Sequence, residues 1–317
     1  MDHMQYIFGP VSSRRFGNSL GINVVPFKVC SYDCIYCEVG KTTKKIIEQK
    51  PYVVVDELIE EFKEVYNKYR GYVDVITITG QGEPTLNNQL GEIIEKIRRY
   101  STTPILTLTN GSLLFIDEVR LALSKANMVC TSLDAVSPEI FYKINNPTLG
   151  LNISHIINGL IEFSMFYSGK LFIEVLLVKG FNDKRDHIDE IIGVIKKCKY
   201  HMIQINTVYR PPSYKIAEPI DETKLLEIEN YMEDRGIKIN KASRNYKKSL
   251  VDDELLEEYI LNTTALRPLC VDEIIKIYNV STFKIDKIMQ KLILKEKLLV
   301  LKHGDKNYYI KSSNRRL

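Results

Sequence analysis

Short apolar runs alternate with amphipathic segments from about residue 20 to about residue 240 of the 317-residue chain, and this alternation restricts the fold more than any other feature. Runs rich in β-branched residues predict strands at 21–25, 73–78, 105–109, 128–133, 171–178 and 202–208. Apolar residues at helical spacing predict helices at 56–69, 90–100, 116–124, from near 138 through 153–167, at 187–198 and at 222–235. Six strands that alternate with helices indicate a parallel sheet with right-handed crossovers.

The strand pattern by itself fits both an open doubly wound sheet and a curved partial barrel. Every unusual polar motif of the chain, however, comes directly after one of the expected strands. In β/α barrels the active site lies at the carboxyl ends of the strands, so this placement favours the barrel. The expected fold class is therefore α/β, with a partial (β/α)6 TIM-like barrel.

The character of the chain changes after residue 239, where a basic, polar stretch at 241–248 predicts a linker. Helical patterns follow at 253–261, 271–278 and 282–294, and two apolar runs at 298–301 and 308–311 flank the turn at 303–305. Three helices and a hairpin are the pattern of a winged helix-turn-helix. We expect a barrel domain at 1–239, a linker at 240–251 and a winged helix-like domain at 252–317.

Composition and sequence pattern argue against three classes of protein: membrane-spanning, secreted and disulfide-rich. No run of about 18 uncharged apolar residues is present, so we expect no membrane span. The first residues lack the basic and apolar regions of a signal peptide, which predicts a cytoplasmic location. Six cysteines in a chain of this length do not make a disulfide scaffold, but three of them crowd between residues 30 and 37, which indicates metal or redox chemistry.

Cys30, Cys34 and Cys37 have the spacing C-x3-C-x2-C on an expected loop. Soft thiolates select zinc, copper(I) or iron–sulfur clusters. A structural zinc site needs four ligands, and a zinc knuckle would have to be completed by a residue far away in the sequence. Three cysteines suit a cubane cluster in which one iron is left without a protein ligand, which is what a substrate-binding redox cluster requires.

This spacing resembles that of the radical S-adenosylmethionine (SAM) superfamily, in which an aromatic residue, here Tyr36, commonly precedes the third cysteine. The resemblance implies a [4Fe–4S] cluster, bound SAM and a 5′-deoxyadenosyl radical that abstracts hydrogen from a substrate. Residues 80–84, Gly-Gln-Gly-Glu-Pro, resemble the superfamily's GGEP motif, which implies that Gly82, Glu83 and Pro84 bind the SAM ammonium group. Without the cysteines, the same five residues would indicate only a tight turn before a helix.

The resemblance extends to residues after the later strands. It implies SAM contacts by Asn110, by Ser132 and Asp134, and by the segment that contains Lys179. Asn110-Gly111 is also a common turn. Asn206 and Arg210, after the sixth strand, are candidate substrate ligands.

Within the superfamily the chain is similar to the branch that includes the tRNA wyosine synthases, through residues 8–15, 19–21 and 25–28. Arg14 and Arg15 in this signature suit an anionic substrate group or an ion pair. Two features depart from that branch. No cysteine precedes Cys30 to bind a second cluster, and the C-terminal region differs. The substrate is therefore open, and RNA is one candidate.

Residues 267–317 contain 12 Lys or Arg residues against 5 Asp or Glu. Lysines recur at 284, 287, 291 and 295, the expected footprint of a surface that binds a phosphate backbone. A solvated helix face, a peptide partner or a structural cap would give the same pattern. Radical SAM chemistry further implies a reductant such as ferredoxin or flavodoxin. The alternative function is a nucleic-acid-binding regulator that uses its cluster to sense iron or redox state.

Overall fold

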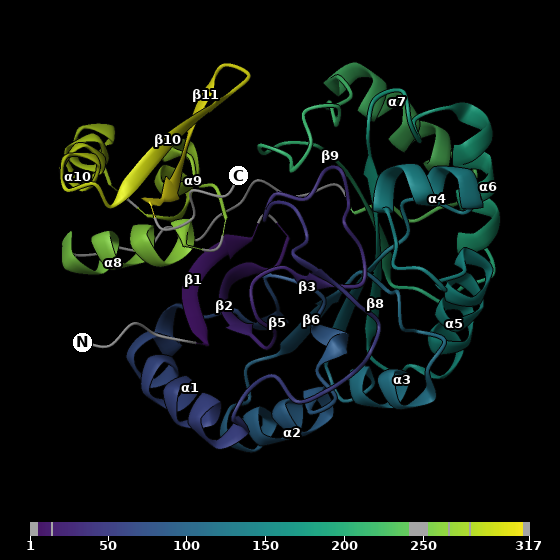
Figure 1. Ribbon diagram of the computed structural model, residues 1–317, viewed down its shortest axis with the longest axis horizontal. Helices are drawn as coiled ribbons and strands as arrows, with labels where there is room; N and C mark the ends of the chain where they lie inside the picture. The colour runs from purple at the N-terminus through teal and green to yellow at the C-terminus, as the bar shows by residue number, and fades with distance from the viewer. Residues whose placement is uncertain (1–5, 14, 241–252, 266, 279, 313–317) are drawn as a thin grey trace.

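A curved seven-stranded sheet is the framework of the protein (Figure 1). In this computed structural model the described residues are 6–13, 15–240, 253–265, 267–278 and 280–312. In spatial order the strands are β1 (Ile7–Ser13), β2 (Gly17–Asn23), β5 (Val75–Thr79), β6 (Ile105–Thr109), β7 (Met128–Ser132), β8 (Lys170–Leu177) and β9 (Met202–Thr207). β1 runs antiparallel to β2, and every other neighbouring pair is parallel.

The expected α/β class with a mostly parallel sheet is confirmed, and the arrangement is consistent with a partial barrel. β1 was not predicted, and neither were the two-residue strands β3 (Val29–Cys30) and β4 (Lys44–Lys45). The strand expected at 21–25 begins at Gly17 instead. It starts earlier because residues 17–19 pair with β1, a contact that only the hairpin creates.

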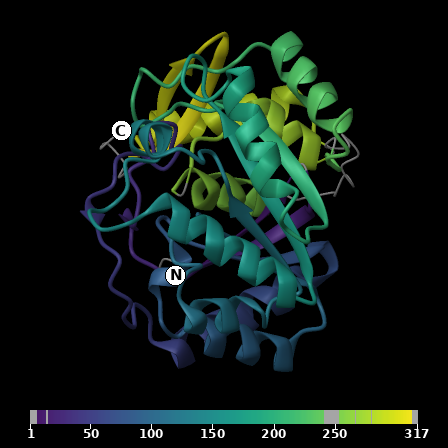
Figure 2. The ribbon, with the colours of Figure 1, turned by 90° about the vertical axis from the view of Figure 1, so that its right-hand side faces the viewer.

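Helices cover the outer face of the sheet in Figures 1 and 2. They are α1 (Val55–Tyr69), α2 (Leu90–Tyr100), α3 (Asp117–Leu123), α4 (Pro138–Asn145), α5 (Ile153–Phe166), α6 (Arg185–Ile195) and α7 (Glu222–Glu233). The helical region expected from 138 to 167 is two helices, because Asn146 has a left-handed φ of 42° and Pro147 cannot continue a helix. Among the described residues, no helix combines the length and the apolar character that a membrane crossing requires.

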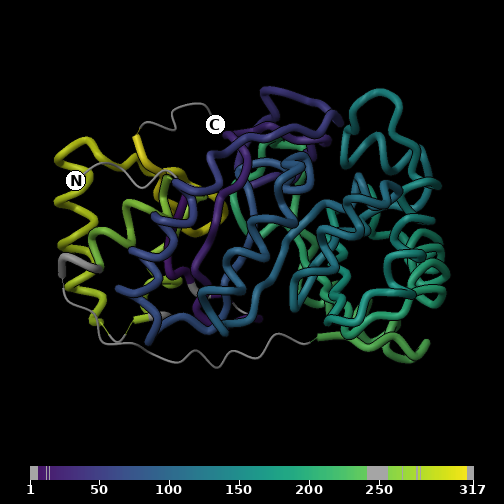
Figure 3. Tube along the Cα trace, turned by 90° about the horizontal axis from the view of Figure 1, so that it is seen from below, coloured from purple at the N-terminus to yellow at the C-terminus, as the bar shows by residue number. Residues whose placement is uncertain are grey.

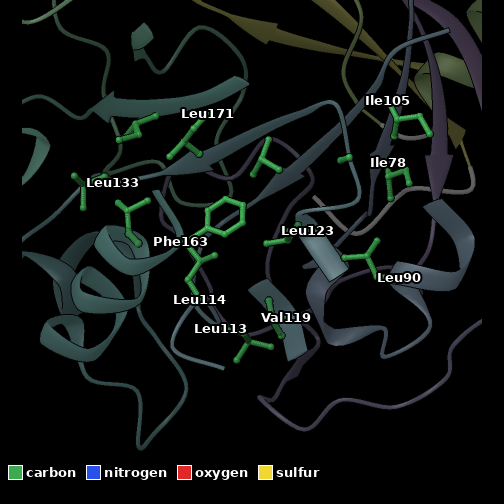
Figure 4. Close-up of a cluster of buried hydrophobic side chains, with 14 of the residues drawn as sticks. Ile78, Leu90, Ile105, Leu113, Leu114, Val119, Leu123, Leu133, Phe163 and Leu171 are labelled. Atoms are coloured by element: carbon green, nitrogen blue, oxygen red, sulfur yellow. The ribbon is translucent and has the colours of Figure 1, made fainter. Parts of the chain in front are cut away.

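Alternate residues of each strand face opposite sides of the sheet. Ile78 and Ile105 point to the helices and join the main core, where α5 contributes Phe163 (Figure 4). Cys130 and Phe172 belong to a separate cluster on the other side of the strands. The concave side is therefore lined by alternate side chains of β5 to β9, and the polar ones among them are available for a site.

The C-terminal elements have their own core. They are α8 (Asp253–Thr264), α9 (Val271–Ile277), α10 (Thr282–Leu294), β10 (Leu298–His303) and β11 (Lys306–Lys311). The three expected helices and the hairpin are present, and the hairpin strands are longer than expected. This part of the chain packs against β1, where Val11 contacts its core, and Figure 3 shows it beside the purple strand β1. The expected linker lies outside the described residues except for Asn240.

Gly159 on α5 determines how closely that helix packs on the turn before α3. A Cβ atom there would lie 2.4 Å from the backbone carbon of Leu114 and 2.5 Å from the backbone nitrogen of Phe115. We expect Gly159→Ala to lower the free energy of unfolding by about 1–3 kcal/mol, because backbone must move to admit the methyl group. Urea unfolding of the purified chain measures the change.

Gly193 on α6 is the matched control, because a Cβ atom there meets nothing within 4 Å. Gly193→Ala should raise the free energy of unfolding by roughly 0.5–1 kcal/mol, since alanine restricts the unfolded chain and favours a helix. Equal effects of the two substitutions would contradict the packing argument.

Candidate active site

The cysteine loop lies at the carboxyl ends of the parallel strands. It leaves β3 at Cys30 and returns to β4 at Lys44, which pairs with Val29. The Asp33 N–H donates to the carbonyl of Asn145 at 3.0 Å, and the Ile35 N–H donates to that of Ile144 at 2.9 Å. The loop is therefore held against the end of α4, more than a hundred residues away in sequence.

Each cysteine sulfur accepts a hydrogen bond from a different part of the chain. Asn110 Nδ2 lies 3.6 Å from Cys30 Sγ, and Asn145 Nδ2 lies 3.5 Å from Cys34 Sγ. Lys28 Nζ lies 3.2 Å from Cys37 Sγ. These donors suit sulfur that carries negative charge, as a cluster ligand does. The residues present therefore fit an iron–sulfur cluster.

The electrostatics of the loop follow from its burial. Burial, and after it the Glu83 carboxylate, raises the pKa of the Cys30 thiol to about 12. Burial also raises the pKa of Cys34. Burial lowers the pKa of Lys28, but the sulfurs of Cys37 and Cys30 outweigh it, so the pKa is raised overall.

Across the described part of the chain, no three His, Cys, Asp or Glu side chains lie close enough to hold one metal ion. The expectation here concerns a cluster of four irons, in which each of the three cysteines would bind a different iron. The ligand roles of the three cysteines therefore remain a prediction.

The loop at residues 80–84 packs directly on the start of the cysteine loop. The Glu83 N–H donates to the carbonyl of Val29 at 3.0 Å. A Cβ atom on Gly82 would lie 1.8 Å from that same carbonyl oxygen. Position 82 therefore requires glycine because the two backbones touch.

The Glu83 carboxylate is 2% exposed and accepts four hydrogen bonds from the chain. Thr85 donates from its N–H at 3.0 Å and its hydroxyl at 2.6 Å, and Thr109 donates from its hydroxyl at 2.6 Å. The Asn110 N–H donates to the second oxygen at 2.7 Å. Burial raises the pKa of Glu83, although these donors favour its ionised form.

Asn110 connects the end of β6 to the cysteine loop. Its side-chain amide donates to Ser31 Oγ at 2.9 Å in addition to approaching Cys30, and its Oδ1 accepts from the Ser112 N–H at 2.9 Å. The turn that Asn110-Gly111 indicated therefore directs the Asn110 amide to the cysteine loop. A contact between Asn110 and SAM stays a prediction.

Asp134 lies beyond the end of β7 and is 3% exposed. Its carboxylate accepts from the Tyr36 hydroxyl, from Asn145 Nδ2 at 3.0 Å and from the Leu176 N–H at 2.9 Å. Burial raises its pKa to about 6. Tyr36 and Asp134, both expected near SAM, thus contact each other, while Ser132 is half-buried and pairs with Glu174 of β8 in the sheet.

A polar cluster on β8 and β9 contains two of the expected substrate ligands. Arg15 contacts the side chains of both Glu174 and Gln204, and Asn206 Nδ2 donates to Glu174 at 2.9 Å. Arg15 therefore forms an ion pair within the chain, which is one of the two roles expected for it. Arg14 lies outside the described residues.

Arg210 and Lys179 stand apart from that cluster. Arg210 pairs with Glu38 at 2.6 Å and with Glu273 of α9 at 2.5 Å, so it joins the cysteine loop to the C-terminal elements. The Lys179 side chain is largely exposed, and its Nζ lies 3.7 Å from Glu218 Oε2.

Sequence reasoning missed Lys28, Glu38 and Asn145 as members of the site. Lys28 could have been noticed as a cation in the otherwise apolar run Val24–Val29 just before the first cysteine. Nothing in the sequence links Glu38 to Arg210, or Asn145 to Cys34, because these pairs meet only in the fold.

These features define a class of protein: an α/β protein with a cysteine loop at the carboxyl ends of its parallel strands, where β/α enzymes have their active sites. Residues 24–195 match the model of the radical SAM superfamily. A UPF0026 protein of Helicobacter pylori strain J99 is 34% identical over 310 residues, 97% of this chain and 98% of that protein. The chain belongs to the radical SAM superfamily of enzymes, and within it to the UPF0026 family.

Two further similarities are more limited. A protein named GTPase Obg of Brachyspira hyodysenteriae is 35% identical over 288 residues, 90% of this chain but 42% of that protein, so the chain spans less than half of it. The solved structure of TYW1 with a lysine–pyruvate adduct has a TM-score of 0.52 at 19% identity and covers 78% of each chain. That likeness shows a shared fold.

The Arg210 pairing predicts a measurable effect on stability. Glu273→Gln should lower the free energy of unfolding by about 1.5–3 kcal/mol, because Arg210 and Arg267 each lose a charged partner. Urea unfolding at pH 7 measures the loss. The control is Asp272→Asn on the same helix, whose partner Lys306 is 54% exposed, and it should change stability by no more than about 0.5 kcal/mol.

The loss of stability caused by Glu273→Gln should depend on pH. Burial opposes ionisation of Glu273, but Arg267 and Arg210 outweigh it and hold its pKa at about 2, below the ordinary 4.5. The contribution of the Glu273 carboxylate to the free energy of unfolding is therefore complete above pH 4.5 and is lost as the pH falls towards 2. The difference between wild type and Glu273→Gln should shrink over that window, and a constant difference would contradict the pairing.

Proposed function

We propose that this enzyme binds one [4Fe–4S] cluster through Cys30, Cys34 and Cys37 and cleaves SAM reductively. When bound, the cluster supplies the electron that splits SAM into methionine and a 5′-deoxyadenosyl radical, which takes a hydrogen atom from the substrate. The observation that carries the proposal is the direct contact between the cysteine loop, the 80–84 loop and Asn110. A low-potential reductant such as ferredoxin or flavodoxin would provide the electron.

For the SAM site, we assign the ammonium group to the backbone of residues 80–84. Glu83 holds that loop in place, because its carboxylate already accepts four hydrogen bonds within the chain. Asn110 and the half-buried Ser132 supply polar groups for the ribose or the methionine carboxylate. Asp134 acts by positioning Tyr36. The segment that contains Lys179 contacts the adenine through its backbone.

For the substrate, we assign the polar cluster of Arg15, Glu174, Gln204 and Asn206. Gln204 is fully buried, and its Nε2 has no hydrogen-bond partner among the described residues. A buried donor without a partner is costly unless a ligand or water satisfies it. Arg210 instead connects the cysteine loop to α9.

We further propose that residues 252–317 form a separate domain of the winged-helix type, and that the barrel comprises residues 1–239. The C-terminal elements have their own hydrophobic core and the order of three helices and a hairpin, and both features support this division. Lys287 and Lys291 on α10 and Lys295 directly after it are exposed, although Lys291 pairs with Glu257. We favour RNA as the partner, because lysines at this spacing suit a phosphate backbone.

Removing the three ligands should abolish the cluster. Anaerobically reconstituted wild type should hold about four iron and four sulfide per chain, and Cys30→Ala, Cys34→Ala and Cys37→Ala combined should hold almost none. The matched control replaces Cys130, Cys198 and Cys270 with alanine and should keep full iron. Iron and sulfide analysis measures both, and full iron in the first variant would refute the assignment.

SAM binding separates the enzyme from a regulator that only senses iron or redox state. Reconstituted wild type with dithionite should convert SAM to 5′-deoxyadenosine and methionine. Glu83→Gln should weaken SAM binding by about 1.5–3 kcal/mol, because the charge-assisted hydrogen bonds that hold the 80–84 loop are lost. Glu92→Gln, an exposed change on α2, is the control. Absence of SAM binding by wild type in equilibrium dialysis would favour the regulator.

A further inference from the structure

The ammonium group of Lys28 is buried at the cysteine loop, where the proposed function assigns it no role. The residue is 2% exposed. Its Nζ lies 3.2 Å from Cys37 Sγ, and across the described residues no Asp or Glu forms an ion pair with it. A buried cation needs a compensating negative charge, and here the charges that face it are those of the cysteine sulfurs.

The backbone of Lys28 keeps the side chain in this position. Its φ is +54°, a left-handed conformation that residues other than glycine seldom adopt. Its N–H donates to the Gln81 carbonyl at 2.7 Å, and its carbonyl accepts from the N–H groups of Thr43 at 3.2 Å and Lys44 at 3.1 Å. Lys28 is thus held between the 80–84 loop and the end of the cysteine loop, and the surroundings maintain the unfavourable φ.

The three sulfurs differ in the charge of their donors. Cys30 and Cys34 face the neutral amides of Asn110 and Asn145, whereas Cys37 faces a cation. Hydrogen bonds to the sulfurs and net charge are among the means by which a protein sets the reduction potential of an iron–sulfur cluster. A positive charge favours the state with one more electron.

We propose that Lys28 tunes the cluster held by Cys37, making its one-electron reduction more favourable through the charge of its ammonium group. The proposal rests on the proposed function. In the step concerned, a bound oxidised cluster would accept one electron from an external low-potential donor, and the Lys28 ammonium would offset the added negative charge without transferring a proton. Lys28 thereby acts before SAM is cleaved.

The test is an EPR-monitored redox titration of the reconstituted full chain, without SAM, with dithionite as the reductant. Lys28→Met should make reduction at least tenfold less favourable, a midpoint potential lower by about 59 mV for a one-electron couple. Lys28→Arg keeps the charge and should stay close to wild type. Lys44→Met removes one exposed lysine from the same loop and controls for net charge.

Several outcomes would overturn the proposal. One is a Lys28→Met midpoint no lower than that of Lys44→Met. Another is an equal fall in Lys28→Met and Lys28→Arg, which would show that shape matters and charge does not. If Lys28→Met loses its iron, retention by Lys28→Arg supports the charge contact, and loss in both refutes it. A wild type that binds no cluster would instead refute the proposed function, so the two failures are distinguishable.

Discussion

The buried carboxylate of Glu83 is the interaction on which the rest of the site depends. A carboxylate at 2% exposure is costly unless its oxygens are satisfied, and four donors from Thr85, Thr109 and Asn110 do so. These bonds connect the 80–84 loop to the end of β6. The Asn110 side-chain amide then reaches Cys30, and the backbone N–H of Glu83 donates to the carbonyl of Val29. Glu83 thus connects the three segments that the proposed SAM and cluster sites require.

Cations near the site are paired within the chain, and this changes how the sequence motifs are interpreted. Arg15 pairs with Glu174, and Arg210 pairs with Glu38 and Glu273. Neither guanidinium is a free anchor for an anionic substrate. The contact of Lys28 with Cys37 is different, because its acceptor is a sulfur whose charge would change with the cluster. In the proposed function, recognition of the substrate therefore depends more on hydrogen bonding in the Arg15, Glu174, Gln204 and Asn206 cluster than on net positive charge.

The C-terminal elements contact both loops of the proposed cofactor site. Gln81 Nε2 donates to the carbonyl of Ala265 at 3.1 Å, and Glu273 on α9 reaches the cysteine loop through Arg210 and Glu38. The Tyr308 hydroxyl of β11 donates to the carbonyl of Tyr209 at 2.7 Å. A partner that binds this part of the chain would therefore act on residues adjacent to Cys37 and to Gly82. This gives the proposed winged helix a physical route to the cofactor site.

The six parallel strands, most of the helices and the C-terminal helices with their hairpin were predictable, because periodicity reports which side of an element is buried. The order of polar motifs after strands likewise predicted one edge of the sheet as the site. β1 could not be predicted, because its partner β2 and the C-terminal core decide its pairing. The sequence by itself determined the class of enzyme, through the cysteine spacing and the alternation of elements. Only the tertiary structure decided which charged side chains pair with each other, because Lys28, Arg15 and Arg210 meet partners that folding brings from 9, 159 and 63 residues away.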